Sequence, residues 1–564
     1  MKATFNFSLL FLIFAAIVGL NTKVLINEKI TFREGNLDLV SSSLSDEVLS
    51  TEEMKFDNIN LKVNLDVDNF YYPCNITMDS TDEEVEEYKR LSRSYAKNYY
   101  KEKNGNVVSS LKVNGYLDKY VSSYAPIVEF EFTPENYLKY GKEVLTELSS
   151  CNAVDSICVS SGSQVQLEPQ MILSLNVMNA YNDYQQGLYT GEGVRVGVLE
   201  SGVVDEDHEN FSSDNLTVRN VWYFSETVTE HATQMASLIG GYNGIAPDAK
   251  IYSVQAYGEL TGEIDWLLDN NVDIINMSFA YEEYLGTYDD YSAYVDYIAY
   301  HYNVTFVGCA SNNIGTTHKV ANPNLGYNVL TVGATSYSDI LCGFSSYLTD
   351  PVSFKPDILA PGANICVPGY TSGDSGTSYS TAIVSGTLAL LMERIPALKA
   401  RPPLVKALAC GSAEYVGYTS FEINGYDEKL GAGRFNYYDF GLNYGFYTNE
   451  FNVTSSSPAN LKNIKIHLYE GETINICLSW LAYTDGTRRS IDMTAYELVV
   501  TNSNGILITK RDVQYSNTLF ISLDIQYDDR YTISVNRITS GNEMVNPNGE
   551  YVAYDMNIFD TPSF

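Results

Sequence analysis

Short apolar segments alternate with helix-like segments between residues 193 and 392, and this alternation constrains the fold more than any other feature. The apolar segments are rich in β-branched residues and cover 193–200, 250–255, 272–278, 305–309 and 329–332. The helix-like segments begin at Glu230, at Glu263 and at the turn before Ser378. This alternation predicts a mostly parallel sheet with helices on both faces, because parallel strands are joined by helical crossovers. The sequence therefore predicts an α/β fold for this region.

Polar residues stand at or just after the ends of several predicted strands. Glu200 ends the first strand, Ser278 ends the strand 272–278, and Asn312 follows the strand 305–309. In open α/β sheets the chemistry is found at the carboxyl ends of the strands. We therefore expect these three side chains to converge.

A turn of small residues, Gly376-Thr377-Ser378, brings a serine to the start of a helix rich in Ala, Leu, Val and Met. The first turn of a helix carries unpaired N–H groups and partial positive charge, which favour a developing oxyanion. A serine there can act as a nucleophile, or it can simply cap the helix, as Ser and Thr usually do.

Five histidines occur in the chain: His208, His231, His301, His318 and His467. His231 differs from the others because it opens a helix, after a strand that ends in a carboxylate and before the helix-start serine. Acyl transfer needs a nucleophile, a base that takes its proton, and an acid that orients the base. It also needs a donor for the oxyanion, which the side chain of Asn312 could supply.

These motifs, in this order, resemble those of the subtilisin-like serine peptidases, the subtilase family, over about residues 171–438. The matching motifs are Gly191-Glu192-Gly193-Val194, Val198-Leu199-Glu200-Ser201-Gly202, Glu230-His231-Ala232-Thr233, Gly244-Ile245-Ala246-Pro247, Asp273-Ile274-Ile275-Asn276-Met277-Ser278-Phe279, Ser311-Asn312, Lys355-Pro356-Asp357-Ile358-Leu359-Ala360-Pro361-Gly362 and Gly376-Thr377-Ser378. The resemblance implies the subtilisin-like fold and the activity of a serine endopeptidase.

The resemblance also implies roles for individual residues. His231 would be the general base, Glu200 the acid that orients it, and Ser378 the nucleophile. The backbone N–H of Ser378 and the side chain of Asn312 would form the oxyanion hole. A polypeptide substrate would lie extended beside three consecutive residues and bind mainly through backbone hydrogen bonds. The corresponding substrate-binding residues are Ser278, Phe279 and Ala280.

Three residues depart from the family pattern. Glu200 stands where the family normally has Asp, Ala232 where it prefers Gly, and Ala382 where it prefers Pro. The extra methylene of a glutamate moves its carboxylate by about 1.5 Å. Two functions therefore remain open: a working peptidase with a Glu/His/Ser triad, or a weakened or inactive relative that binds peptides or acts in surface adhesion.

A second serine motif competes with the first. Gly373-Asp374-Ser375-Gly376 resembles the nucleophile motif of chymotrypsin-like peptidases, which would make Ser375 the nucleophile. Those enzymes are all-β proteins, and the α/β alternation contradicts that fold. We therefore favour Ser378.

We expect five segments along the chain. Residues 1–20 begin with one basic residue and continue as a short apolar run with small residues, which is typical of a signal peptide. Residues 21–110 form an acidic and solvated, partly helical leader, and residues 111–170 an α+β pro-segment that resembles the family's inhibitor. Residues 171–440 form the α/β domain. Residues 441–564 hold short strands separated by turns, which predict a β-sandwich.

The N-terminal segment and the net charge limit where the chain acts and what it binds. A signal peptide implies secretion, to the medium or the cell surface, and an uncleaved anchor is the alternative reading. The formal net charge of −35 argues against nucleic acid and against an anionic membrane surface as partners. We therefore expect two kinds of partner, polypeptide substrates and the chain's own pro-segment acting as an inhibitor.

No cofactor or metal is expected, because no Cys/His cluster has zinc spacing and no acidic loop has a recognisable calcium pattern. The C-terminal sandwich resembles the jelly-roll or pre-peptidase C-terminal domains of secreted proteases. That resemblance rests on the segments 496–500 and 503–505.

Overall fold

The computed structural model describes most of the chain. The described residues are 40–42, 59–161, 188–437 and 448–560, apart from gaps at 67–69, 75, 78–79, 220–225, 259, 282–284, 313–317, 348–354, 371–372, 417–428, 455, 488–490, 513–515 and 539–549. The chain forms two compact units, Met1–Tyr71 with Ser94–Gly162, and Tyr72–Arg93 with Ser163–Phe564. The predicted signal peptide, residues 1–20, lies outside the described residues. No helix in the described part is long and apolar enough to cross a bilayer.

The first unit contains a five-stranded sheet and helix α3. The strand order is β1 (Val40–Ser42), β5 (Val154–Ser161), β2 (Ile59–Leu65), β4 (Ile127–Phe132) and β3 (Asp118–Val121). Only β1 and β5 pair in parallel. Helix α3 (Pro134–Ser150) begins where the side chain of Thr133 accepts a hydrogen bond from the Asn136 N–H. Apolar side chains of the sheet and α3 form one core, which confirms the predicted α+β region.

The second unit is built around a seven-stranded sheet in which every pair of neighbours is parallel. Its order is β12 (Ile358–Pro361), β11 (Val329–Thr335), β10 (Thr305–Cys309), β9 (Ile274–Met277), β6 (Arg195–Glu200), β8 (Lys250–Gln255) and β7 (Leu216–Val218). The central strands are buried along nearly their whole length, as expected of a parallel sheet covered on both faces. The predicted α/β fold is confirmed.

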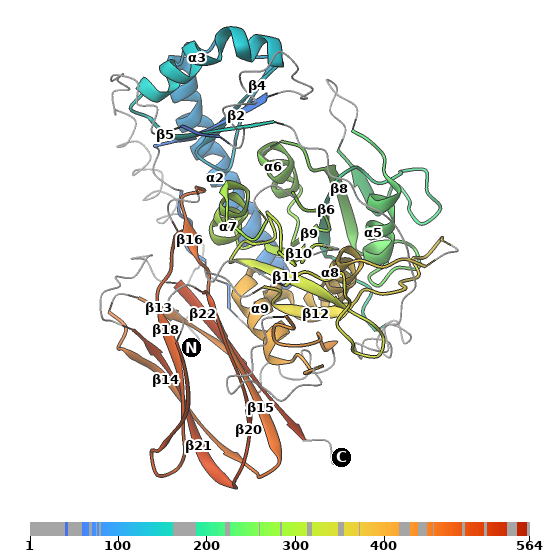
Figure 1. The fold of residues 1–564 in the computed structure, drawn as a ribbon, viewed down its shortest axis with the longest axis vertical. Helices are drawn as coiled ribbons and strands as arrows, with labels where there is room; N and C mark the ends of the chain where they lie inside the picture. The colour runs from blue at the N-terminus through green and yellow to red at the C-terminus, as the bar shows by residue number, and fades with distance from the viewer. Residues whose placement is uncertain are drawn as a thin grey trace, which may run out of the picture. The chain divides into compact units, whose positions relative to one another are not determined.

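Helices lie on both sides of this sheet, with α6 and α7 on one side in Figure 1 and α5 and α8 on the other. The helices are α5 (Glu230–Gly240), α6 (Thr261–Asp269), α7 (Asp290–Tyr302), α8 (Thr377–Arg394) and α9 (Pro402–Gly411). Helix α8 is buried from its first residue through Met392, because almost every one of those side chains is small or apolar. It therefore packs against β9, β10, β11 and β12 at once.

The C-terminal part forms two antiparallel four-stranded sheets, as predicted for a β-sandwich. One sheet has the order β13 (Asn449–Val453), β22 (Glu550–Asp560), β15 (Glu472–Ser479), β20 (Thr518–Asp524), and the other β14 (Asn460–Leu468), β21 (Asp529–Arg537), β18 (Tyr496–Thr501), β19 (Leu507–Asp512). Inward side chains of both sheets form one core around the fully buried Trp480.

The sandwich and the α/β region share packing and hydrogen bonds. Helix α9 contacts β15 and β22, and Cys477 and Phe520 belong to the same apolar cluster as the α/β core. The Asn328 carboxamide exchanges two hydrogen bonds with the backbone of Ala482, at 2.8 and 2.9 Å. Asn517 donates to the same carboxamide at 2.9 Å. The sandwich is therefore packed onto the α/β region, although its sequence alone predicts a separate domain.

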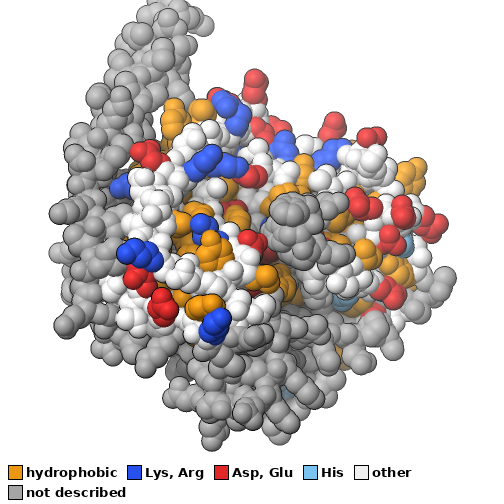
Figure 2. Space-filling model, turned by 90° about the horizontal axis from the view of Figure 1, so that it is seen from above, with side chains coloured by type: hydrophobic (Ala, Val, Ile, Leu, Met, Phe, Trp, Pro, Cys, Tyr) orange, Lys and Arg blue, Asp and Glu red, His pale blue; other side chains and the backbone are white. Residues whose placement is uncertain are grey.

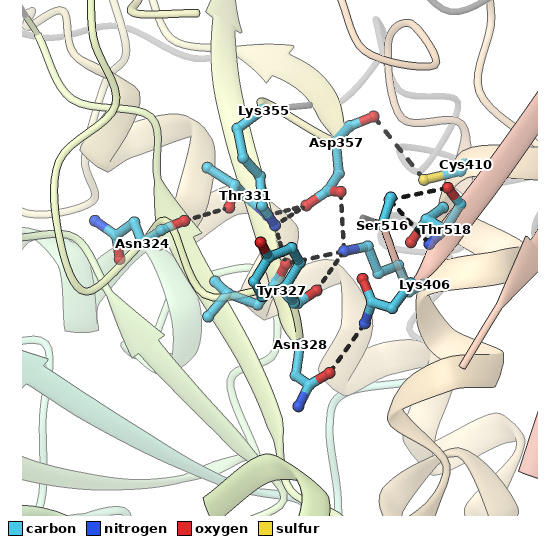
Figure 3. Close-up of polar contacts among 12 residues, drawn as sticks. Asn324, Tyr327, Asn328, Thr331, Lys355, Asp357, Lys406, Cys410, Ser516 and Thr518 are labelled. Atoms are coloured by element: carbon cyan, nitrogen blue, oxygen red, sulfur yellow. Dashed lines mark hydrogen bonds and ion pairs between the residues drawn. The ribbon is translucent and has the colours of Figure 1, made fainter. Parts of the chain in front are cut away.

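A buried ion cluster connects the parallel sheet to helix α9 (Figure 3). Asp357 Oδ2 accepts hydrogen bonds from Lys355 Nζ at 2.7 Å and from the Thr331 N–H at 2.8 Å. Asp357 Oδ1 lies 2.9 Å from Lys406 Nζ. Burial lowers the pKa of Lys355 to about 8. Burial also works to raise the pKa of Asp357, but the charges of Lys355 and Lys406 outweigh it and hold that pKa below its ordinary value.

Replacing Asp357 by Asn is expected to destabilise the protein by about 3–5 kcal/mol, because two buried lysines then lose their anion. Urea unfolding followed by circular dichroism measures this loss. Asp512→Asn is the matched control, since the Asp512–Lys510 pair is exposed and such pairs contribute about 0–1 kcal/mol. Equal losses in the two variants would contradict the role given to the buried cluster.

Acidic side chains are spread over the described part of one face of the molecule (Figure 2). Figure 2 shows Asp and Glu side chains spread across the described part of one face, with Lys and Arg among them. Spreading like charges limits their mutual repulsion, which matters in a chain with a net charge of −35.

Candidate active site

Glu200 and His231 meet at the carboxyl end of the parallel sheet. Glu200 is the last residue of β6, and His231 is the second residue of α5, whose first turn is capped by the side chain of Thr229. Glu200 Oε2 lies 3.1 Å from His231 Nδ1, and Glu200 Oε1 accepts a hydrogen bond from the Ser278 N–H at 3.0 Å. The Glu200 side chain is fully buried, whereas that of His231 is 14% exposed. This contact places the imidazole proton on Nδ1 and leaves Nε2 able to accept a proton.

Ser378 is the second residue of α8 and is buried. Its Oγ donates to the Ser278 carbonyl at 3.0 Å, and Ser278 Oγ donates to the Ser378 carbonyl at 2.9 Å. These reciprocal bonds join the end of β9 to the start of α8. Among the described residues, no hydrogen bond joins Ser378 Oγ to His231. Catalytic hydrogen bonds are often long in the absence of substrate.

Asn312 lies beside the same helix start. Its Oδ1 accepts hydrogen bonds from the Thr377 N–H at 2.8 Å and from Thr377 Oγ at 2.9 Å. Because both partners donate, the carboxamide must turn its oxygen to Thr377 and its Nδ2 the other way. A Cβ added at Gly376 would lie 3.1 Å from Asn312 Nδ2. Glycine at 376 therefore leaves room for this amide.

The segment predicted to bind substrate follows β9. The Ser278 N–H donates to Glu200, and the Ser278 carbonyl accepts from Ser378 Oγ. The Phe279 carbonyl accepts a hydrogen bond from Asn324 Nδ2 at 2.8 Å. Phe279 is fully buried, whereas Ala280 is half-buried. In the part of the chain that the structure describes, the Ala280 backbone makes no hydrogen bond.

The competing serine, Ser375, makes its described hydrogen bonds within the turn before α8. Its Oγ accepts a hydrogen bond from the Asn364 N–H at 2.9 Å, and its own N–H donates to Asp374 Oδ1 at 2.7 Å. Both contacts stabilise the turn before α8, so the role of Ser375 is structural.

Three residues near His231 were not singled out from the sequence. Tyr379 packs edge-on against the His231 ring, with centroids 6.2 Å apart. Its hydroxyl lies 2.9 Å from Asp374 Oδ2 and 2.7 Å from Gln234 Oε1. One hydroxyl proton cannot serve two acceptors, so both contacts are hydrogen bonds when Asp374 is protonated or when the Gln234 amide is turned so that its Nε2 donates to the Tyr379 oxygen. Burial raises the pKa of Asp374 to about 7, against the Tyr379 bond, which works to lower it.

The sequence offered only an indirect signal for this trio. The Gly-Asp-Ser-Gly motif drew attention to Ser375 instead of Asp374, and Tyr379 resembles any apolar residue in a buried helix. Gln234 lies three residues after His231, on the same helix.

Comparisons with known proteins agree with the motifs. The profile of the Subtilase family matches residues 191–433. The minor extracellular protease Epr of Bacillus subtilis (strain 168) is 33% identical over 227 residues, which are 37% of this chain and 33% of that protein. Fervidolysin from Fervidobacterium pennivorans, a solved structure, covers 88% of this chain and 72% of its own at 14% identity, with a TM-score of 0.49.

The fraction of a relative's length that aligns with this chain differs from one relative to the next. The chain spans 33% of the length of Epr and 58% of the lengths of subtilisin NAT from Bacillus subtilis subsp. natto and subtilisin E from Bacillus subtilis (strain 168). Subtilisin from Bacillus pumilus is 30% identical over 241 residues, which are 38% of this chain and 81% of that protein. With most of that relative matched, and with the family's motifs placed at one end of a parallel sheet, the chain belongs to the subtilase family.

Proposed function

We propose that this chain is a secreted serine endopeptidase that hydrolyses peptide bonds through an acyl-enzyme. Glu200, His231 and Ser378 form its triad. The observation that carries the proposal is the 3.1 Å contact between the buried Glu200 carboxylate and His231 Nδ1, in a chain with the family's serine at the start of α8.

The reaction begins with proton transfer from Ser378 to His231. Rotation of the Ser378 side chain away from the Ser278 carbonyl turns its Oγ to His231 Nε2, and Oγ then attacks the substrate carbonyl carbon. His231 gives the proton to the leaving amine as the C–N bond breaks, which leaves the acyl-enzyme. A water molecule then attacks the acyl-enzyme, with His231 again taking and returning the proton. The bond to Ser378 Oγ breaks, and the carboxylic acid product is released. The Glu200 carboxylate stabilises the imidazolium that forms in each step.

The oxyanion is held by the start of α8 and by Asn312. The Ser378 N–H lies in the first turn of the helix, where N–H groups have no partner within the helix. Asn312 Nδ2 supplies the second donor, because its carboxamide oxygen is occupied by Thr377. Loss of one such donor costs about 10²–10³-fold in kcat.

The substrate lies extended beside Ser278, Phe279 and Ala280. The Ala280 backbone offers its N–H and carbonyl to a peptide strand. The Ser278 carbonyl becomes available to the peptide once Ser378 Oγ has turned to His231. Polypeptides are therefore the substrate class, and backbone pairing supplies much of the binding.

A fluorophosphonate probe tests this proposal, because it reacts only with an activated serine. We expect covalent labelling of the processed protein at Ser378, mapped by mass spectrometry, and no labelling of Ser378→Ala. Absence of labelling in a correctly folded wild-type protein would refute the peptidase.

The second candidate is a weakened or inactive relative that binds peptides or acts in surface adhesion. It is favoured by the hydrogen bond from Ser378 Oγ to the Ser278 carbonyl, an acceptor that cannot act as a base. In that case the probe leaves Ser378 unlabelled while peptides still bind.

The pro-segment, residues 111–170, is proposed to inhibit the enzyme and to be severed from the α/β domain by self-cleavage between residues 160 and 170. Most of that cleavage region lies outside the described residues. Secretion, directed by residues 1–20, is likewise part of the proposal, and the relative Epr is named as extracellular. Mass spectrometry of the secreted proteins should show a shorter wild type than Ser378→Ala. Identical lengths would exclude self-processing.

A further inference from the structure

Part of the N-terminal region belongs to the same compact unit as the active site. Residues Tyr72–Arg93, here called the docked segment, group with Ser163–Phe564, and they include the first turns of α2 (Asp82–Ser110). The sequence predicts a solvated leader over these residues. The structure differs, because one face of this part of α2 is buried.

Lys89 lies at the centre of the buried face. Its ammonium group donates to the Asn271 carbonyl at 3.0 Å and pairs with the Asp273 carboxylate. The two charged side chains are 1% and 0% exposed. Burial lowers the pKa of Lys89 to about 8, while Asp273 works to keep it charged. A buried pair of this kind is lost only at considerable cost, since each partner would need a new one.

Arg93 completes the contact one helical turn later. Its guanidinium donates to the carbonyls of Leu268 and Val272, at 3.3 and 3.0 Å. These carbonyls lie at the end of α6 and in the turn after it. The last carbonyls of a helix lack partners within the helix and carry partial negative charge, which cations stabilise. The docked segment therefore caps α6.

Two acidic residues of the docked segment pair with cations of the α/β region. Glu86 Oε2 lies 2.5 Å from an Arg195 nitrogen, and Asp82 pairs with Lys399. Lys399 Nζ also donates to the Gly193 carbonyl at 2.8 Å. Opposite charges thus face each other along the helix.

The part of the docked segment that precedes Lys89 is held by an apolar cluster and by a hydrogen bond to Cys74. Val85 and Tyr88 pack with Ile76 and Ala400. The Tyr551 hydroxyl donates to the Cys74 carbonyl at 2.8 Å, which joins the docked segment to β22.

The docked segment also contacts the strands that carry the site. Asp273, the partner of Lys89, accepts a hydrogen bond from the Arg195 N–H at 2.8 Å through its other oxygen. Arg195 begins β6, which ends at Glu200, and Asp273 directly precedes β9, which leads to Ser278. The Lys89–Asp273 pair therefore supports the starts of both strands.

We propose that the docked segment is a permanent, non-covalently bound part of the catalytic unit, so that cleavage between residues 160 and 170 does not release it. The occupant of this surface is a segment of the chain itself, matched by its charges, its cap on α6 and its apolar cluster. The inference rests on the proposed self-processing, and its experiment separates the two.

The experiment cuts the chain without using its own activity. A recognition sequence for a site-specific protease is inserted after residue 165 of the full-length Ser378→Ala protein, which is then cut and passed over a size-exclusion column under native conditions. We expect the N-terminal and C-terminal chains to elute together, as identified by mass spectrometry of the denatured peak. Separate elution would overturn the inference.

A pair of variants identifies the surface that holds the chains together. Lys89→Met with Arg93→Met removes both buried cations and is expected to raise the dissociation constant of the cut chains by about 10²-fold or more. Arg90→Met is the matched control, because Arg90 is 59% exposed and pairs with Glu87 of its own helix. It should leave the dissociation constant unchanged. Equal dissociation constants for the double variant and the control would also overturn the inference, since other residues would then hold the cut chains together.

A milder variant covers the case in which the double variant fails to fold. Asp82→Asn removes one partner of the Lys399 pair at a half-exposed position. The uncut variant should keep the parent's melting temperature within a few degrees, and the cut variant should dissociate measurably faster than Arg90→Met. Because the foreign protease makes the cut, this result is independent of self-cleavage, whose failure would appear only as an uncut wild-type protein.

Discussion

Replacing Ser378 by Ala is expected to lower kcat/KM for peptide cleavage by about 10⁶-fold, because the members of a triad act as a unit and the nucleophile has no substitute. The site shows why the fold itself should survive. Among the described residues, Ser378 Oγ makes one hydrogen bond, to the Ser278 carbonyl, and the reciprocal bond from Ser278 Oγ to the Ser378 carbonyl does not depend on the Ser378 hydroxyl. Hydrolysis of a fluorogenic peptide by the purified variant measures the loss.

Ser375→Ala provides the control for this substitution. Ser375 lies three residues before Ser378, and its hydroxyl accepts a hydrogen bond from the Asn364 N–H. We expect kcat/KM to remain close to that of the wild type. A large loss in Ser375→Ala together with an active Ser378→Ala would show that the wrong serine has been assigned.

Replacing Glu200 by Gln is expected to lower kcat by about 10⁴-fold, the cost of holding the histidine in the wrong tautomer. The carboxylate accepts from two donors, the Ser278 N–H and His231 Nδ1. A Gln side chain has one acceptor oxygen. If that oxygen serves Ser278, its NH₂ group faces Nδ1, and the imidazole must carry its proton on Nε2, where the base is needed. Steady-state kinetics, with circular dichroism to confirm folding, would measure this loss.

Glu200→Asp tests whether the longer acid is a defect. The observed glutamate reaches both donors, at 3.0 and 3.1 Å, so the backbone of this site is placed for the longer side chain. Aspartate would withdraw the carboxylate and is expected to cost about 10²-fold, as small misplacements in active sites do. A gain in rate would instead mean that the native triad is compromised.

Much of the fold could be predicted from local patterns. The strands ending at Glu200 and preceding Ser278, the helix opened by His231 and the helix opened by Ser378 all follow from periodicity and from small-residue turns. The approach of Ser278 to Glu200 was also expected, because parallel strands bring their carboxyl ends to one edge. The pairing of Glu200 with His231 was implied by the resemblance to the subtilase family. The orientation of Ser378 Oγ was not, since a hydroxyl rotor depends on every acceptor around it.

The sequence by itself determined the α/β alternation, the sandwich strands and the order of the candidate catalytic residues, because each is written in neighbouring residues or in spacing along the chain. Only the tertiary structure decided that Lys89 meets Asp273, that Asp357 lies between Lys355 and Lys406, and that Tyr379 joins Asp374 to Gln234. Lys89 and Asp273 stand 184 positions apart. A charged residue has the same local pattern whether it is solvated or buried, and its partner is chosen by packing between distant segments. Burial of charge is therefore a property of the assembled fold.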